Sequence, residues 1–93
     1  KLNPRESKTF LNLGVILILK GDLEAAELSI KKSIGLNNKE SIAYMNLGLI
    51  YKEKGEKTKS LEALLESISL NSKYNFPRKQ RDLRKIYWTK AFR

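Results

Sequence analysis

Residues 10–17 read FLNLGVIL, and residues 44–51, which lie 34 positions later, read YMNLGLIY. Both stretches contain Asn-Leu-Gly in the same register, and the similarity extends outward on both sides. Residues 7–40 laid over residues 41–74 without a gap give twelve identities in 34 positions. A fixed period of this length is the signature of a repeat protein, in which each copy is one structural unit stacked on the next.

Each copy of the repeat predicts two helices joined by a short turn. Gly21 is a typical helix stop, and Asp22 directly after it is a typical helix cap. Apolar residues recur at spacings of three and four, as expected on one face of a helix. The predicted helices cover residues 7–20, 23–36, 39–54 and 57–70, and a further helix is predicted over residues 77–92.

The pattern resembles the tetratricopeptide repeat, a 34-residue helix–turn–helix unit with aromatic, Leu-Gly and small residues at fixed positions. Here these positions hold Phe10, Leu13, Gly14, Leu17, Ala26 and Ile30, and then Tyr44, Leu47, Gly48, Tyr51, Ser60 and Leu64. The resemblance implies an all-α, right-handed helical repeat of antiparallel hairpins. Small residues such as Gly14 and Gly48 would let the two helices of each hairpin approach closely.

We therefore expect one domain over residues 1–93. Its segments are the tail of a preceding repeat (residues 1–6), two repeats (7–40 and 41–74) and a basic capping helix (75–93). The first segment is interpreted as a tail because Leu2-Asn3 matches Leu36-Asn37, although a chance match of a free N-terminal segment is the alternative. Because the chain begins with Lys1, we expect it to be a piece of a longer protein.

The composition excludes much catalytic chemistry. The chain has no Cys and no His, so it lacks a thiol nucleophile, an imidazole base and the usual zinc ligands. We therefore expect no enzyme activity, no cofactor and no metal site. The longest unbroken apolar run, Val15–Leu19, is far shorter than the roughly 20 residues of a spanning helix. This predicts a protein without a membrane span, and we expect it to be cytoplasmic.

The resemblance also implies a peptide-binding groove along the first helix of each copy. The positions that would line it are Lys8, Leu11, Asn12, Val15, Ile18, Ile42, Met45, Asn46, Leu49 and Lys52. Because the lining is mostly apolar, the predicted function is protein–protein interaction or scaffolding, with a partner's peptide or helix held in the groove. Amides such as Asn12 would hold the peptide backbone. Family members that clamp a C-terminal carboxylate have Lys and Asn in place of Leu11 and Val15, so that clamp is not expected.

The first predicted helix is apolar on nearly every side over residues 10–19. A helix of this kind is expected to be buried on every side, and its own hairpin partner covers only part of it. A preceding repeat is the favoured cover. The alternatives are a partner protein, a second copy that would make the chain self-associate, and a first helix that is simply rich in leucine.

The net charge of +9 is concentrated near the C-terminus, where residues 74–93 carry seven basic groups and one acidic group. The favoured interpretation is the solvated face of a capping helix. The alternative is an anion-binding surface in which basic side chains follow phosphates and Trp88 stacks on a base. Nucleic acid, an acidic protein and an anionic membrane surface are its candidate partners. The basic residues concerned are Arg78, Arg81, Arg84 and Lys85.

Overall fold

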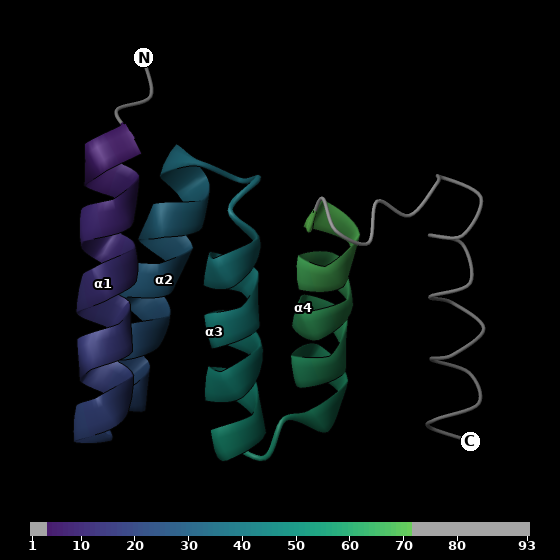
Figure 1. Cartoon of the computed structure of the whole chain (residues 1–93). Coiled ribbons are helices and arrows are strands. Elements are labelled where there is room, and N and C mark those ends of the chain that lie inside the picture. The colour runs from purple at the N-terminus through teal and green to yellow at the C-terminus, as the bar shows by residue number, and fades with distance from the viewer. Residues whose placement is uncertain (1–3, 72–93) are drawn as a thin grey trace.

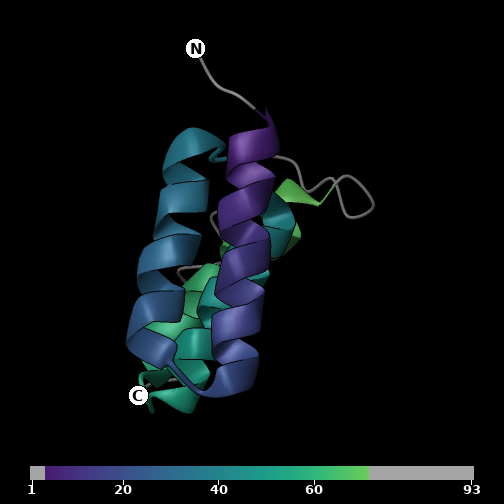
Figure 2. The same cartoon turned by 90° about the vertical axis from the view of Figure 1, so that its left-hand side faces the viewer.

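The computed structural model describes residues 4–71, which form four helices and no strand. The helices are α1 (Pro4–Lys20), α2 (Leu23–Leu36), α3 (Ser41–Glu53) and α4 (Lys57–Leu70). They form two antiparallel hairpins, α1 with α2 and α3 with α4, arranged in chain order (Figure 1). Seen from the α1 end, the first hairpin lies in front of the second (Figure 2). The predicted all-α helical-repeat class is confirmed.

The turn inside each hairpin is built the same way. Gly21 and Gly55 adopt φ values of 83° and 81°, a left-handed conformation that glycine takes without steric cost. The residue after each glycine donates its backbone N–H to a carbonyl of the last helical turn, at 2.9 Å and 2.8 Å. Asp22 caps α2 by accepting a hydrogen bond from the backbone N–H of Ala25. The glycine stop at Gly21 and the aspartate cap at Asp22, both predicted from the sequence, are therefore present, and Gly55 has the same conformation after α3.

The bounds predicted for α2 and α4 are confirmed, whereas those for α1 and α3 need correction. The first helix begins at Pro4 rather than at residue 7, because proline in the first turn has no backbone N–H to satisfy and a φ suited to the helix. The third helix begins at Ser41 rather than at residue 39. There the Asn37 side chain accepts the backbone N–H of Lys39 and holds a turn. The predicted helix over residues 77–92 lies outside the described residues.

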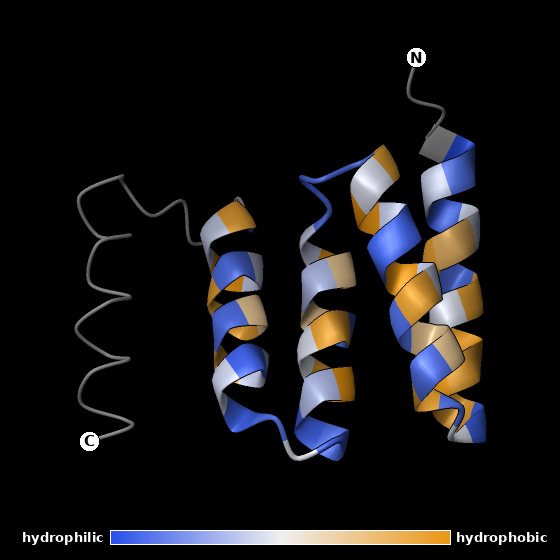
Figure 3. Cartoon of the chain, turned by 180° about the vertical axis from the view of Figure 1, so that it is seen from behind, coloured by the Kyte–Doolittle hydropathy of each residue, from blue (hydrophilic) through white to orange (hydrophobic). Residues whose placement is uncertain are grey.

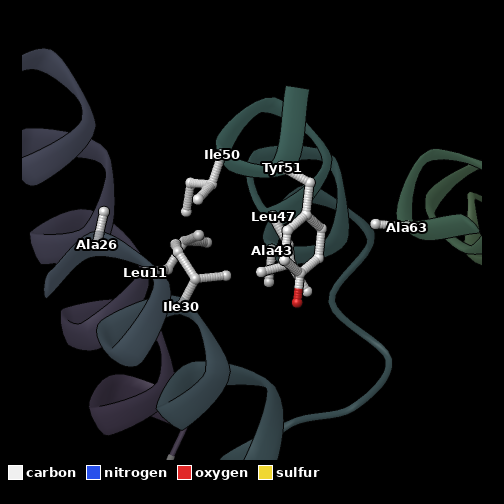
Figure 4. Packing of buried hydrophobic residues seen from close by; sticks show 8 residues of the cluster. All are labelled: Leu11, Ala26, Ile30, Ala43, Leu47, Ile50, Tyr51 and Ala63. Carbon is white, nitrogen blue, oxygen red and sulfur yellow. The ribbon is translucent and has the colours of Figure 1, made fainter. Parts of the chain in front are cut away.

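The core lies between the hairpins as well as within them. Leu11 and Ile30 point from the first hairpin toward α3, where they meet Leu47 and Ile50 (Figure 4). The remaining buried apolar residues are Ala26, Ala43, Tyr51 and Ala63. Because Ile30 and Ile50 are fully buried, the contact between hairpins contributes substantially to the stability of this short array.

Close approach inside each hairpin depends on glycine. A Cβ added to Gly14 would lie 2.6 Å from Cγ1 of Ile30, and one added to Gly48 would lie 2.8 Å from Cδ2 of Leu64. Real Cβ atoms do not approach other atoms this closely, so a larger residue would displace the facing Ile30 or Leu64 side chain or push the two helices apart. The interpretation of both glycines as close-approach residues is consistent with this geometry.

Serine side chains also link the two helices of each hairpin by hydrogen bonds. Ser33 Oγ donates to the carbonyl of Ser7 and Ser67 Oγ donates to the carbonyl of Ser41, both at 2.8 Å. Ser60 Oγ also donates to the carbonyl of Gly48 across the second hairpin. Ser33 and Ser67 stand at equivalent positions of the two copies, and the sequence pattern identified Ser60 only as a small residue. In the structure the hydroxyl of each of these serines is buried or half-buried and donates a hydrogen bond to a backbone carbonyl. Without such a partner, burying the hydroxyl would be costly.

Candidate peptide-binding surface

An apolar stripe on α3 faces solvent. Ile42, Met45 and Leu49 are exposed to 49%, 43% and 42%. Their spacing of three and four residues places them on one face of the helix. The face of α3 that packs on the first hairpin carries other residues, among them Leu47 and Ile50. The helix therefore uses one apolar face for folding and presents a second to solvent.

The equivalent positions on α1 are only partly available. Because the second hairpin repeats the first, residues 34 positions apart face the same side of the array. Lys8 and Asn12 are exposed and Val15 is half-buried. Leu11, the equivalent of Met45, lies instead in the core, and Ile18 packs against the core. The structure thus leaves Lys8, Asn12 and Val15 as the accessible part of the predicted lining on this helix.

Two predicted polar positions on α3 have different surroundings. Asn46 is buried, and its Nδ2 donates to the carbonyl of Ile42 at 3.0 Å. That donor is occupied within the helix, so binding of a peptide backbone by this amide stays a prediction. Lys52 is exposed one turn beyond Leu49, at the end of the stripe. The predicted anion-binding residues Arg78, Arg81, Arg84 and Lys85 lie outside the described residues.

An ion-pair network between α2 and α3 was not anticipated. Glu27 on α2 accepts from Lys54 Nζ at 2.8 Å, pairs with Lys31 Nζ at 2.9 Å and accepts from the Tyr51 hydroxyl at 3.2 Å. Lys54 also pairs with Glu24 at 3.0 Å. The hydrogen bond from Lys54 and then that from Lys31 lower the pKa of the Glu27 carboxyl to about 2. The carboxylate is therefore charged at neutral pH and joins the two hairpins.

The repeat pattern could not reveal this network, because its acidic members occur once. Glu24 and Glu27 correspond to Thr58 and Leu61 in the second copy. The only sequence signal is the charge complementarity between the first two turns of α2 and Lys54, which cannot be read without knowing how the hairpins stack. The same acidic turns do not form a metal site. No group of three or more His, Cys, Asp or Glu side chains among residues 4–71 is placed to hold a metal ion.

Within residues 4–71 no helix combines the length and the hydropathy needed to cross a membrane. Comparison with curated proteins gave no match, and comparison with solved structures gave none either. The family model of the tetratricopeptide repeat matches twice, over residues 7–40 and 42–74, and these two matches cover well over half of the chain. Two repeats in this register, each folded as a helical hairpin around a Leu-Gly pair, identify the chain as a member of the tetratricopeptide repeat family.

Proposed function

We propose that this chain binds a peptide or a helix of a partner protein on the apolar stripe of α3 and the neighbouring exposed part of α1. Tetratricopeptide repeats are generally protein–protein interaction modules and are typically not enzymes. The observation that carries the proposal for this chain is the exposure of Ile42, Met45 and Leu49 side by side on one helix face. Apolar contacts there would supply affinity, because burying such side chains removes apolar surface from water.

The spacing of the stripe limits what it can bind. Anchors at positions i, i+3 and i+7 run along the helix axis for about two turns, or roughly 10 Å. A partner segment with two or three apolar side chains on one edge fits this length, whether it is a helix or an extended strand. Lys8 and Lys52 are both exposed at predicted groove positions. They favour a partner whose apolar anchors are flanked by acidic residues.

The experiment selects peptides against the chain from a displayed library and then compares two aspartate variants. Met45→Asp places a charge in the stripe, whereas Leu28→Asp places one on α2 at an apolar side chain that is 72% exposed and outside the predicted groove. We expect the selected peptides to lose binding to Met45→Asp by at least about tenfold and to keep binding to Leu28→Asp. Both variants should stay helical by circular dichroism. Peptides that tolerate Met45→Asp would contradict the proposal.

The rival proposal is anion binding through Arg78, Arg81, Arg84 and Lys85. What supports it is the charge of residues 74–93, which hold seven basic groups and one acidic group. The single tryptophan, Trp88, lies in this segment and reports on it by fluorescence. If about five phosphates of duplex DNA are neutralised, the slope of log affinity against log salt should be about −4 to −5. An unchanged fluorescence with DNA, RNA, anionic vesicles and an acidic peptide would contradict it.

A further inference from the structure

The face of α3 that packs on the first hairpin has a counterpart on α1 with nearly the same residues. The counterparts of Leu47, Ile50 and Lys54 are Leu13, Ile16 and Lys20, so the residue type is identical at all three pairs of positions. Asn46 likewise corresponds to Asn12, and Ala43 to Thr9. We call the α1 set the upstream face; its members are Thr9, Asn12, Leu13, Ile16 and Lys20. It is therefore a copy of the α3 surface that packs on the first hairpin in this structure.

The two surfaces differ in what covers them. Leu47 is 8% exposed and Ile50 is fully buried, because α1 and α2 lie against α3. The counterparts Leu13 and Ile16 are 44% and 52% exposed. Hydrophobic residues recur along α1 (Figure 3). A repeat that permanently ends an array normally turns a polar face outward. The upstream face instead keeps the apolar residues of an internal interface.

The charged part of the interface is also present on α1. In the seam between the hairpins, Lys54 Nζ lies 2.8 Å from Oε1 of Glu27 and 3.0 Å from Oε2 of Glu24, both on α2. Lys20 occupies the equivalent place on the upstream face and is exposed. A hairpin stacked on α1 as the first hairpin stacks on α3 would bring the start of its second helix to Lys20. Carboxylates at the positions of Glu24 and Glu27 would pair with that ammonium.

We propose that the upstream face is a stacking interface for a further tetratricopeptide hairpin whose second helix carries carboxylates at the positions equivalent to Glu24 and Glu27. The second hairpin of another copy of this chain is a poorer occupant, since Thr58 and Leu61 stand at those two positions and leave Lys20 without a carboxylate. The proposal concerns the side of α1 that carries Leu13 and Ile16. It shares only Asn12 with the proposed peptide-binding surface, and it is independent of peptide binding at the α3 stripe.

The test lengthens the chain by one period and measures the accessibility of single cysteines. Residues 7–40 are duplicated in tandem, so that the added copy supplies Glu24 and Glu27 in the required register. Because the chain has no cysteine, Leu13→Cys gives a unique thiol on the upstream face. Leu47→Cys in the original chain is the covered reference, and Leu28→Cys is the exposed reference. The cysteine at position 13 is placed in the downstream of the two copies.

We expect the thiol at position 13 to react rapidly in the original chain, as at position 28, and at least about tenfold more slowly in the lengthened chain, as at position 47. Replacing Glu24 and Glu27 of the added copy by Gln should restore part of the reactivity. Equal reactivity at position 13 with and without the added repeat would overturn the stacking proposal. Full protection without the two carboxylates would overturn the acidic requirement. If protection of the thiol at position 13 rises with protein concentration in the original chain, the occupant of the upstream face is a second copy, and the proposal of a further hairpin is overturned.

Discussion

The seam inside each hairpin and the seam between the two hairpins are built from different chemistry. Inside, close contact depends on glycine and on serine-to-carbonyl hydrogen bonds, and the pairs Ser33–Ser7 and Ser67–Ser41 recur at the 34-residue period. Between the hairpins, large aliphatic side chains meet and an ion-pair network centred on Glu27 occurs once. The repeated residues thus determine how a hairpin closes. The apolar face that receives a neighbouring hairpin is repeated as well, since Leu47 and Ile50 correspond to Leu13 and Ile16. The carboxylates that pair with Lys54 across this interface, Glu24 and Glu27, occur in the first copy only.

This difference predicts where a substitution costs most. Ile50 is fully buried in the interface between the hairpins. Ile50→Ala would therefore leave a cavity between them, which could be filled only if the two hairpins moved toward each other. We expect a loss of about 2–4 kcal/mol in the free energy of unfolding. Urea denaturation followed by circular dichroism measures it. Leu28→Ala, at an exposed position of α2, is the matched control and should change stability by less than about 0.5 kcal/mol. A similar loss in both variants would show that the seam is not a main source of stability.

The contact between the two helices of a hairpin can be tested with two helical glycines in different surroundings, one inside α1 and one in the last turn of α2. Gly14 faces the fully buried Ile30, whereas an added Cβ at Gly35 meets nothing within 4 Å. Gly14→Ala should destabilise by about 1–2 kcal/mol, because overpacking exceeds the gain in helix propensity. Gly35→Ala should stabilise by up to about 0.5–1 kcal/mol through propensity alone. Thermal unfolding of the two variants measures both effects. A stabilising Gly14→Ala would mean that the Ile30 side chain or the two helices can move aside without cost.

The hairpins were predictable because their determinants are local and repeated. Gly21 and Gly55 mark the turns, and the Leu-Gly pairs mark the close contact, without any knowledge of stacking. Helix starts were predicted less well. Pro4 opens α1 early, and a side-chain hydrogen bond from Lys39 N–H to Asn37 delays α3. Such choices depend on single hydrogen bonds that a period does not encode.

The candidate surface was predicted only in part for the same reason. Equivalent residues in two copies face the same side, yet they differ in burial because their neighbours differ. Leu11 is covered by the second hairpin, whereas Met45 at the equivalent position is exposed. The network around Glu27 was missed because its partners Tyr51 and Lys54 are distant in the sequence, by 24 and 27 positions. It also has no counterpart in the second copy. Stacking, rather than the repeat itself, decides these features.

The smallest effect concerns the charged part of the seam. Glu27→Gln removes the carboxylate that Lys54 and Lys31 share, and we expect a loss of about 1 kcal/mol at pH 7, typical of a partly exposed ion-pair network. Glu62→Gln, at an exposed position on α4, should have almost no effect. Urea titrations of the two variants beside the original chain at neutral pH measure both values. Equal losses would show that the network contributes only through general charge.

The pH dependence of the same pair separates the ion pairs from packing. The pKa of Glu27 is about 2 in the folded chain, against an ordinary value of 4.5. Since the folded state lowers this pKa, the carboxylate stabilises the fold above pH 4.5, and that contribution is lost as the pH falls toward 2. The difference in stability between the original chain and Glu27→Gln should therefore shrink over this interval. A difference that stays constant down to pH 2 would mean that the glutamine disturbs packing, and the seam between the hairpins would then be apolar in its energetics.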